Sequence, residues 1–379
     1  MSFTLNAEQK MVSLMARDFA RKELEPFASE WEKNGIFPVE AVRKMGGLGL
    51  LGMMVPTEYG GSAAGAVSYC LALQEIAYAC ASTAVTMSVA NLSTEPLLKF
   101  GNPAQKEKYL TRLASGEWLG CFALTEPSAG SDPGGLQIRA IDRGDHFLVN
   151  GTKIFITHGG YADLVNLIVR TGQDKGNKDL SAIIVEKGTP GFSVGSKEDK
   201  MGLRASNTVE LIFEDCRVPK ENLLGKLGQG FKIAMTALDS GRIGIASQAL
   251  GIARACLDEA VRYAKERRQF GRAISSFQAI QWMIADMATG IEAAHLLTLS
   301  AAHRKDQGVA FTREASMAKL FSSEIANKVA YHALQIHGGY GYTKEFKIER
   351  LARDARATTI YEGTSEVQRI VIAREVLKV

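Results

Sequence analysis

Cysteine is scarce in this chain, with five among 379 residues and no CxxC pair. An odd number of cysteines without paired spacing argues against a disulfide framework and against a zinc site. Reduced thiols in a cytosol-like compartment are the simpler interpretation. The five residues are Cys70, Cys80, Cys121, Cys216 and Cys256.

The sequence also lacks an apolar run long enough to span a bilayer and a Lys/Arg cluster typical of nucleic-acid binding. Residues 1–6 show neither the apolar core of a signal peptide nor an Arg-rich transit pattern, although a trimmed precursor stays open. We expect no nucleic-acid partner and no integral membrane segment. The expected location is cytoplasmic for a bacterial chain and the mitochondrial matrix for a processed eukaryotic one.

Apolar residues make up 46% of the chain and charged residues 23%, with a formal net charge of +4. These values are ordinary for globular proteins. At roughly 100–200 residues per domain, the length indicates two or three domains.

Hydrophobic periodicity divides the chain into three regions, and together they predict an α+β multidomain fold. We expect an N-terminal helical domain (1–117), a middle antiparallel β domain (118–225) and a C-terminal four-helix bundle with a catalytic loop (226–379). In the first region, Asn6 and Gln9 form a capping-box pattern. The small-residue stretch from Ala77 to Ala90 predicts a buried helix.

The middle region has strand patterns separated by Gly and Pro clusters. Phe147-Leu148-Val149 and Ile154-Phe155-Ile156 flank Asn150-Gly151, which predicts a hairpin with a type I′ turn. The other expected strands are Leu164–Thr171, Leu180–Val185 and Val209–Phe213.

Long apolar-periodic segments in the third region predict a helical bundle, with Gly338-Gly339 ending one helix. These segments are Phe231–Arg268, Phe277–His303 and Arg313–Ile336. Because strands and helices do not alternate, and no GxGxxG or P-loop follows a strand, a Rossmann fold is disfavoured. His332 and His337 lie near one helix end without a third metal ligand, which favours a packing or capping role over zinc.

The segment from Ile360 to Arg369 holds the most specific chemistry. Ser365 and Gln368 can form a capping box for a last helix running to Leu377, which places Glu362 just before its N-terminus. Unpaired amide groups there can bind developing negative charge, so a carboxylate beside them is a plausible base-plus-oxyanion arrangement. From spacing alone, the simpler alternative is that Glu362 only complements the helix dipole.

Tyr361-Glu362-Gly363-Thr364-Ser365 followed by Gln368-Arg369 resembles the catalytic-loop motif of acyl-CoA dehydrogenases. Further blocks are similar to the same family in the same order, and the resemblance runs essentially end to end. The blocks are Leu124–Pro127 with Ala129–Asp132, Lys153–Thr157, Arg267–Gly271 and Gln335–Gly341.

The resemblance implies that Glu362 is the general base that takes the α-proton of an acyl-CoA, while a hydride leaves the β-carbon for FAD. The Glu362 amide would hydrogen-bond the thioester carbonyl, and such donors contribute about 3–4 kcal/mol to lowering the barrier. The product would be a trans-2-enoyl-CoA. Electrons would pass to electron transfer flavoprotein, and the chain would form a homotetramer arranged as a dimer of dimers.

The resemblance also implies the FAD contacts. Phe122, Leu124 and Thr125 would lie along the flavin ring, and Phe155 and Thr157 would cover another face. Arg267 and Phe270 would reach the FAD of a neighbouring subunit, with Gln335, Gly338 and Gly339 near its adenosine end. Thr364 and Glu366, which flank the base, would touch the same cofactor.

For the substrate, Ser131 would contact the CoA moiety, whereas Asp239 and Arg242 would bind substrate and support the base loop. Tyr361 and Gly363, on either side of the base, are assigned to the substrate as well. Each residue has a purely structural alternative: Thr125 and Thr157 are also common strand residues, and Arg267 could be a solvated charge.

Two departures from the family pattern matter. Many members have Trp where this chain has Phe155. Some branched-chain and long-chain members place the base just before an arginine on the long helix, where this chain has Gly241 before Arg242, so Glu362 has no rival.

The segment Asp239–Ala246 most resembles short-chain and short-branched members, so we expect short acyl groups. An acyl-CoA oxidase, a glutaryl-type dehydrogenase and a non-catalytic CoA-binding scaffold of the same fold stay open as alternatives.

Overall fold

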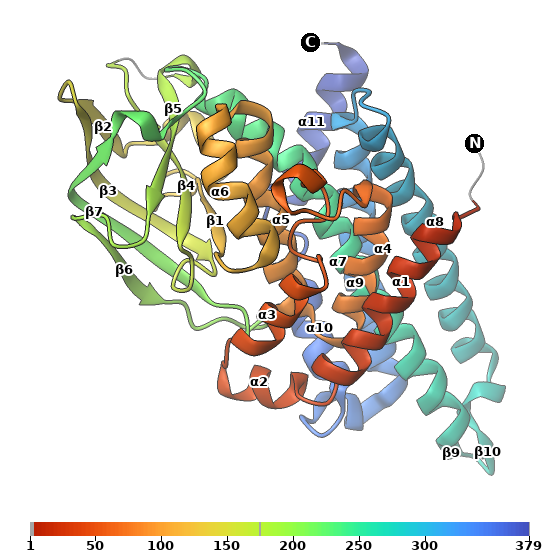
Figure 1. The fold of residues 1–379 in the computed structure, drawn as a ribbon. Helices are drawn as coiled ribbons and strands as arrows, with labels where there is room; N and C mark the ends of the chain where they lie inside the picture. Colours follow the sequence, from red (N-terminus) through yellow and green to blue (C-terminus); the bar gives the residue numbers. More distant parts are fainter. Residues whose placement is uncertain (1–3, 174–175, 379) are drawn as a thin grey trace.

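The computed structural model describes residues 4–173 and 176–378, and it has three successive regions (Figure 1). Helices form the first region, an eight-stranded sheet the second and long helices the third. In Figure 1 the sheet lies on one side, and the helices of the first and third regions pack together on the other. The predicted order of helical, β and helical regions is confirmed.

The changes of secondary structure fall between α6 and β1 and between β8 and α7, where the expected boundaries after residues 117 and 225 lie. That each region is a separate domain stays a prediction. Residues 1–3, part of the segment assessed for a leader peptide, lie outside the described residues.

The helices of the first region begin with the expected cap. Gln9 N donates to Asn6 Oδ1 (2.8 Å) and Asn6 N donates to Gln9 Oε1 (3.0 Å), which satisfies amide groups that a helix start leaves unpaired. A π-helical turn at Ala20–Leu24 follows, just before Pro26. The helices are α1 (Ala7–Phe19), α2 (Ala28–Asn34), α3 (Val39–Gly47), α4 (Gly65–Ala79), α5 (Ala81–Phe100) and α6 (Pro103–Ser115).

The single helix expected over Ala77 to Ala90 is wrong, because Cys80 is extended (φ −149°, ψ 102°) and separates α4 from α5. Small residues allow close packing but do not require a continuous helix, and a tertiary contact holds the break. Gln248 Nε2, from α7, donates to the Ala81 carbonyl (2.9 Å).

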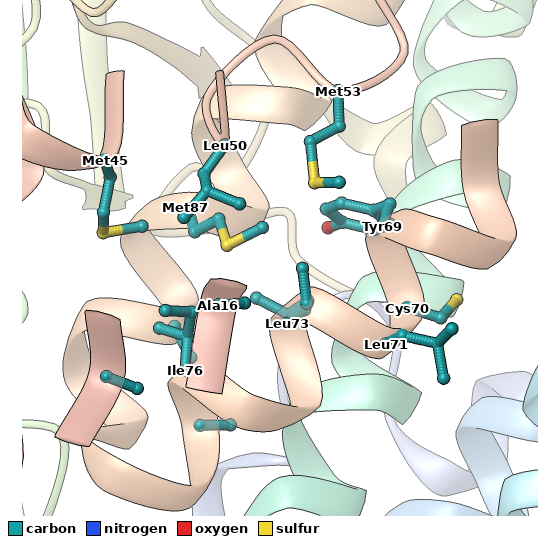
Figure 2. Close-up of a cluster of buried hydrophobic side chains, with 14 of the residues drawn as sticks. Ala16, Met45, Leu50, Met53, Tyr69, Cys70, Leu71, Leu73, Ile76 and Met87 are labelled. Atoms are coloured by element: carbon teal, nitrogen blue, oxygen red, sulfur yellow. The ribbon is translucent and has the colours of Figure 1, made fainter. Parts of the chain in front are cut away.

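Figure 2 shows the hydrophobic core that α3, α4 and α5 build in the first region, which includes Met45, Leu73 and Met87.

The sheet of the middle region has the strand order β6-β7-β3-β2-β4-β5-β8, with β1 also on β4. Most neighbours are antiparallel as expected, but β1 and β2 run parallel to β4. The strands are β1 (Gly120–Ala123), β2 (Arg139–Asp142), β3 (His146–Thr157), β4 (Leu164–Arg170), β5 (Leu180–Glu186), β6 (Phe192–Lys197), β7 (Thr208–Pro219) and β8 (Leu223–Leu224). The expected strands at 164–171, 180–185 and 209–213 correspond to β4, β5 and part of β7.

The hairpin expected at Asn150-Gly151 is wrong, because β3 continues through both residues. The register with β7 shifts between Val149 and Gly151, so the Asn-Gly pair forms a bulge instead of a turn. Asn150 and Asp215 also bond each other across the two strands. A twelve-residue partner strand therefore prevails over the local turn preference.

The long helices of the third region confirm the expected segments to within about three residues. They are α7 (Gly230–Glu266), α8 (Gln278–Asp306), α9 (Thr312–His337), α10 (Lys347–Ala357) and α11 (Ser365–Leu377). Gly338 (φ +58°) ends α9 as expected. Between α7 and α8, the short strands β9 (Arg268–Gln269) and β10 (Arg272–Ala273) form a hairpin that projects from the end of the helices (Figure 1).

Helix α7 joins the first and third regions, since it packs against α4 and α5 as well as α8 and α9. At Gly251 the approach is so close that a Cβ would stand 2.4 Å from the Gln74 carbonyl oxygen.

Among the described residues, no helix is long and apolar enough to cross a membrane.

Candidate active site

The base loop, which we define as residues 358–364, connects α10 to α11 and carries Glu362 in an unusual backbone conformation. Glu362 has φ +52° and Gly363 has φ +90°. Non-glycine residues rarely adopt positive φ, and such strain is found mainly at functional sites. In the described part of the chain, no group accepts a hydrogen bond from the Glu362 amide N–H. That donor is therefore available to a ligand.

The cap of α11 differs from the expected one. Thr364 is the N-cap, and its hydroxyl accepts from Val367 N (3.3 Å), so Ser365 is the first helical residue. Gln368 does not complete a capping box, because its Nε2 reaches back to the carbonyls of Gly363 (3.0 Å) and Glu362 (3.2 Å). Its side chain thus fixes the base loop instead of the helix start.

The carboxyl group of Glu362 points into the protein. The residue as a whole is partly exposed, but Oε2 is buried and has no hydrogen-bond partner among the described residues. Burial raises the pKa of Glu362 to about 7, and the nearby charges of Lys319 and Arg242 oppose that rise. A carboxyl with a pKa near neutrality suits a general base.

Arg242, which lies on α7, is brought close to Glu362 as expected. Its Nη1 binds Asp239 Oδ1 (2.5 Å), and the Thr312 hydroxyl donates to Asp239 Oδ2 (2.6 Å). Burial lowers the pKa of Arg242 and raises that of Asp239. Asp239 therefore supports Arg242. Tyr361 is tied to the same helix, because its hydroxyl donates to Gln248 Oε1.

The residues expected along the flavin ring lie together at the end of β1 and on β3. Ile154 N donates to Thr125 O (2.9 Å), which joins the two segments beside Phe155 and Thr157. Phe155 has φ +57° and a side chain that is 58% exposed, although aromatic residues in strands are usually packed. Phe122, Leu124, Thr125 and Thr157 are partly exposed.

A buried ion pair fixes this edge of the sheet. Lys153 Nζ contacts Glu126 Oε1 and the Leu124 carbonyl, each at 2.8 Å, and Glu126 accepts from the amides of Gln137 and Ile138. Burial lowers the pKa of Lys153 to about 8, while Glu126 opposes that shift. The pair holds the segment around Thr125 rigidly.

The second group of expected cofactor residues lies elsewhere. Arg267, Gly338 and Gly339 line a cavity of about 460 Å³ at the junction of α7, α9 and the β9–β10 hairpin. Phe270, at the tip of that hairpin, is 92% exposed, and Gln335 on α9 is also exposed. The cavity that Arg267, Gly338 and Gly339 line does not include Glu362, and a role of this group toward a neighbouring subunit stays a prediction.

Ser131 and Glu366 are exposed, the first in the turn after β1 and the second in the first turn of α11. Within the described residues, no cluster of three His, Cys, Asp or Glu side chains has metal-binding geometry.

Four residues near Glu362 had no place among the expected site residues for catalysis or binding. Lys319 on α9 donates to the Gly363 carbonyl (2.7 Å), and a Cβ at Gly241 would stand 2.0 Å from Glu362 Oε2. Tyr69 on α4 donates to Ser88 Oγ on α5 (3.3 Å). All four come from helices far from position 362 in the sequence, and only the unusual Gly241-Arg242 pair was a local signal.

Three family models for acyl-CoA dehydrogenases match the chain. The N-terminal domain model matches residues 6–117, the middle domain model 121–216 and the C-terminal domain model 228–377. The chain belongs to the acyl-CoA dehydrogenase family, a family of flavoprotein oxidoreductases.

Individual relatives are similar over their whole length. The short-chain-specific acyl-CoA dehydrogenase of Clostridium acetobutylicum is 48% identical and is covered over 100% of both chains. The butyryl-CoA dehydrogenase structure from Megasphaera elsdenii has a TM-score of 0.98 at 46% identity, again with 100% of both chains covered. A chain solved in a study described as "Electron transferring flavoprotein of Acidaminococcus fermentans: Towards a mechanism of flavin-based electron bifurcation" has a TM-score of 0.99 at 49% identity, with 100% of both chains covered.

Proposed function

We propose that this protein catalyses the FAD-dependent α,β-dehydrogenation of short-chain acyl-CoA thioesters to trans-2-enoyl-CoA. The observation that carries the proposal is the buried, unpartnered Oε2 of Glu362, on a loop whose backbone is strained into place. A buried carboxylate without a hydrogen-bond partner is costly in a folded protein, so it needs a functional reason.

In this mechanism Glu362 removes the proton from the carbon next to the thioester carbonyl. The pKa of about 7 lets the carboxyl be deprotonated near neutral pH and still hold the proton afterwards. Negative charge develops on the thioester oxygen as the proton leaves. The free Glu362 amide N–H would donate to that oxygen, and such donors typically contribute about 3–4 kcal/mol.

The residues at the β1–β3 edge fit a flat, partly polar ring. Phe122, Leu124 and Phe155 offer apolar surface, and the threonine hydroxyls of Thr125 and Thr157 offer hydrogen bonds to its edge. FAD bound there would accept the hydride that leaves the β-carbon. Arg267, with Gly338 and Gly339, would hold the pyrophosphate and adenosine of a cofactor bound mainly to the neighbouring chain, and the cavity lined by these residues has space for such a group.

The remaining expected contact residues lie near Glu362 or on the surface, and we assign each to cofactor or substrate by that location. Thr364 and Glu366 flank the base loop and would approach the same cofactor, whereas Ser131 would contact CoA. Tyr361 and Gly363 would line the substrate on either side of Glu362. Arg242 and Asp239 would support the loop from α7.

A short acyl pocket follows from the packing of α7. A Cβ at Gly244 would stand 2.4 Å from Ser88 Oγ and 2.6 Å from the Tyr69 hydroxyl, so this hydrogen-bonded pair lies directly on the helix. Gly244 is one turn, about 4.5 Å, beyond Gly241, where the Glu362 carboxyl lies. Both side chains are buried, and we expect them to form the far wall of the acyl pocket, with room for only a few methylene groups before it.

The same wall bears on the glutaryl-type alternative. Glutaryl-CoA carries a second carboxylate, which would need a cationic partner at the far end of its acyl group. Tyr69 and Ser88 offer hydroxyl groups there, and Arg242 is already bound to Asp239. A simple short acyl chain therefore suits the pocket better.

We also propose that the reduced enzyme passes its electrons to electron transfer flavoprotein and that the chain forms a homotetramer. Large apolar side chains are exposed on α8, α9 and α11, where a solitary chain would leave them in water. These include Trp282 (64% exposed), Tyr331 (67%) and Ile370 (61%).

The proposal is tested by adding acyl-CoA thioesters of increasing length to the purified, FAD-loaded protein without oxygen. We expect rapid bleaching of the flavin absorbance by butyryl-CoA and slow bleaching by palmitoyl-CoA. Fast reoxidation by oxygen would favour an oxidase, and release of CO₂ from glutaryl-CoA a decarboxylating enzyme. A colourless protein that takes up no FAD would contradict the proposal and favour the scaffold alternative.

A further inference from the structure

Lys319 is a fully buried cation directly beneath the base loop. It lies on α9 with 0% of its surface exposed, and its Nζ donates to the Gly363 carbonyl oxygen at 2.7 Å. Burying an ammonium group is costly unless its charge is offset. In the described part of the chain, no carboxylate lies within ion-pair distance of Lys319. The charge therefore faces the interior without a direct counterion.

The base loop above Lys319 has a strained backbone whose conformation other contacts must stabilise. Glu362 and Gly363 both have positive φ, and the strained Glu362 backbone persists only if its surroundings oppose relaxation. Two side chains donate hydrogen bonds to the Gly363 carbonyl oxygen, Lys319 through Nζ (2.7 Å) and Gln368 through Nε2 (3.0 Å). One of these donors is charged and the other is neutral, so their roles can be separated.

The charge of Lys319 acts on the Glu362 carboxyl. Of the charged groups that face Glu362, Lys319 comes from α9 and Arg242 from α7, and the Tyr69 hydroxyl faces it from α4. Arg242 is paired with Asp239, which offsets much of its charge. Lys319 donates to a neutral carbonyl, so its full charge remains to stabilise the Glu362 carboxylate.

The pKa shifts of Glu362 and Lys319 agree with an uncompensated charge on Lys319 and a largely offset charge on Arg242. Lys319 is the larger of the two charge effects that lower the pKa of Glu362 against the rise caused by burial. In return, burial lowers the pKa of Lys319 to about 8, and the Glu362 carboxylate opposes that shift, as does Glu366 more weakly. The positive charge of Arg242 lowers the pKa of Lys319 further.

We propose that Lys319 is a positioning residue for the dehydrogenation: its ammonium group anchors the Gly363 carbonyl and keeps the adjacent Glu362 side chain as a carboxylate ready to accept a proton. This inference rests on the proposed function, because it assigns a task within the same site. Gln368 shares the anchoring but cannot share the charge effect. A purely structural lysine would influence folding and leave the protonation of Glu362 unchanged.

The test compares Lys319→Met with Gln368→Met in the FAD-loaded protein. The rate of anaerobic flavin reduction by butyryl-CoA is measured across pH for both variants and for the unchanged protein. A second readout needs no turnover: the infrared band of the Glu362 carboxyl, assigned by its loss in Glu362→Gln, is followed through the same pH range. Thermal unfolding and FAD content report folding separately.

We expect Lys319→Met to move the midpoint of both profiles upward by about one pH unit, because the carboxylate loses its cation. Near pH 7 this variant should reduce flavin about fivefold more slowly, because the deprotonated fraction of Glu362 falls from about a half to about a tenth, and raising the pH should restore much of the rate. Gln368→Met should slow the reaction without moving the midpoint. If Lys319→Met takes up no FAD, Lys319→Gln serves in its place, since its amide can donate to Gly363 but carries no charge.

An unchanged midpoint in the Lys319 variant would overturn the inference, and so would an equal shift in Gln368→Met. Failure of the proposed function would look different from either result, because butyryl-CoA would then not bleach the flavin of the unchanged protein.

Discussion

The carboxyl oxygen Oε2 of Glu362 lies against the backbone of Gly241 on α7, where a Cβ would stand only 2.0 Å from it. The proposed base, Glu362, comes from the loop before α11, and the space that its carboxyl occupies comes from a missing side chain on α7, 121 positions earlier. An alternative family arrangement places the base on α7 itself. In this chain the helix provides space instead of the carboxyl.

Gly241→Ala should therefore displace the base. The added methyl group cannot share the position of Oε2, and misplacement of a reacting group by about 1 Å can cost a hundredfold in rate. We expect flavin reduction by butyryl-CoA to slow by about that factor, with FAD content preserved. Gly47→Ala on α3 is the matched control, because nothing lies within 4 Å of its added Cβ. Equal rates in the two variants would show that Glu362 does not depend on this space.

The rate of flavin reduction should rise as the pH passes through about 7. Glu362 accepts a proton only as the carboxylate, and burial holds its pKa near that value. Below the pKa the carboxyl is already protonated and the reaction slows. Rapid-mixing measurements of flavin absorbance across pH test this, and a flat profile through neutrality would contradict the assignment.

Replacement of Tyr69 should lengthen the acyl preference. Tyr69 and Ser88 lie against Gly244, one turn of α7 beyond Gly241, where we propose that the acyl pocket ends, so Tyr69→Val should admit longer chains. We expect the ratio of kcat/KM for octanoyl-CoA to that for butyryl-CoA to rise by about tenfold or more. Tyr69→Phe, which keeps the ring and loses only the hydroxyl, should leave most of the discrimination intact. A ratio unchanged in Tyr69→Val would mean that the pocket ends elsewhere.

The stability of the fold should fall in mild acid because of His158. This residue is 0% exposed, and its Nε2 donates to the Gly120 carbonyl (2.7 Å) as a neutral imidazole. Burial lowers the pKa of His158 to about 4. Because this lies below the ordinary value near 6.5, the contribution is complete above pH 6.5 and is lost as the pH falls toward 4.

The full effect is about 3 kcal/mol, of which about 2 kcal/mol is lost between pH 7 and pH 5. Denaturant unfolding of the unchanged protein and of His158→Gln at pH 5 and pH 7 measures it. The glutamine amide can donate to the Gly120 carbonyl but does not titrate. A variant that loses as much stability as the unchanged protein between these two pH values would rule out His158 as the cause.

Helical periodicity was enough to locate the long helices, since the segment expected at Phe231–Arg268 is α7 at Gly230–Glu266. Local turn and packing signals were less reliable where a tertiary partner decided the outcome. Asn150-Gly151 became a bulge because β7 pairs along all of β3, and Ala77 to Ala90 broke at Cys80 where Gln248 holds the chain.

The base loop could be identified from its motif, but the partners of the base could not. Lys319 lies in a helix whose pattern alone allows a solvated charge, and only the packing of α9 beneath the loop buries it. Tyr69 and Ser88 are ordinary helix residues until α7 brings Gly244 against both. Contacts between residues so distant in the chain leave no local pattern.

Replacement of the carboxyl alone tests the central claim most directly. Glu362→Gln keeps the size of the side chain and the backbone amide but cannot remove a proton. We expect this variant to bind FAD and butyryl-CoA, and to show no bleaching of the flavin when the thioester is added without oxygen. Bleaching at a rate near that of the unchanged protein would contradict the assignment of Glu362 as the base.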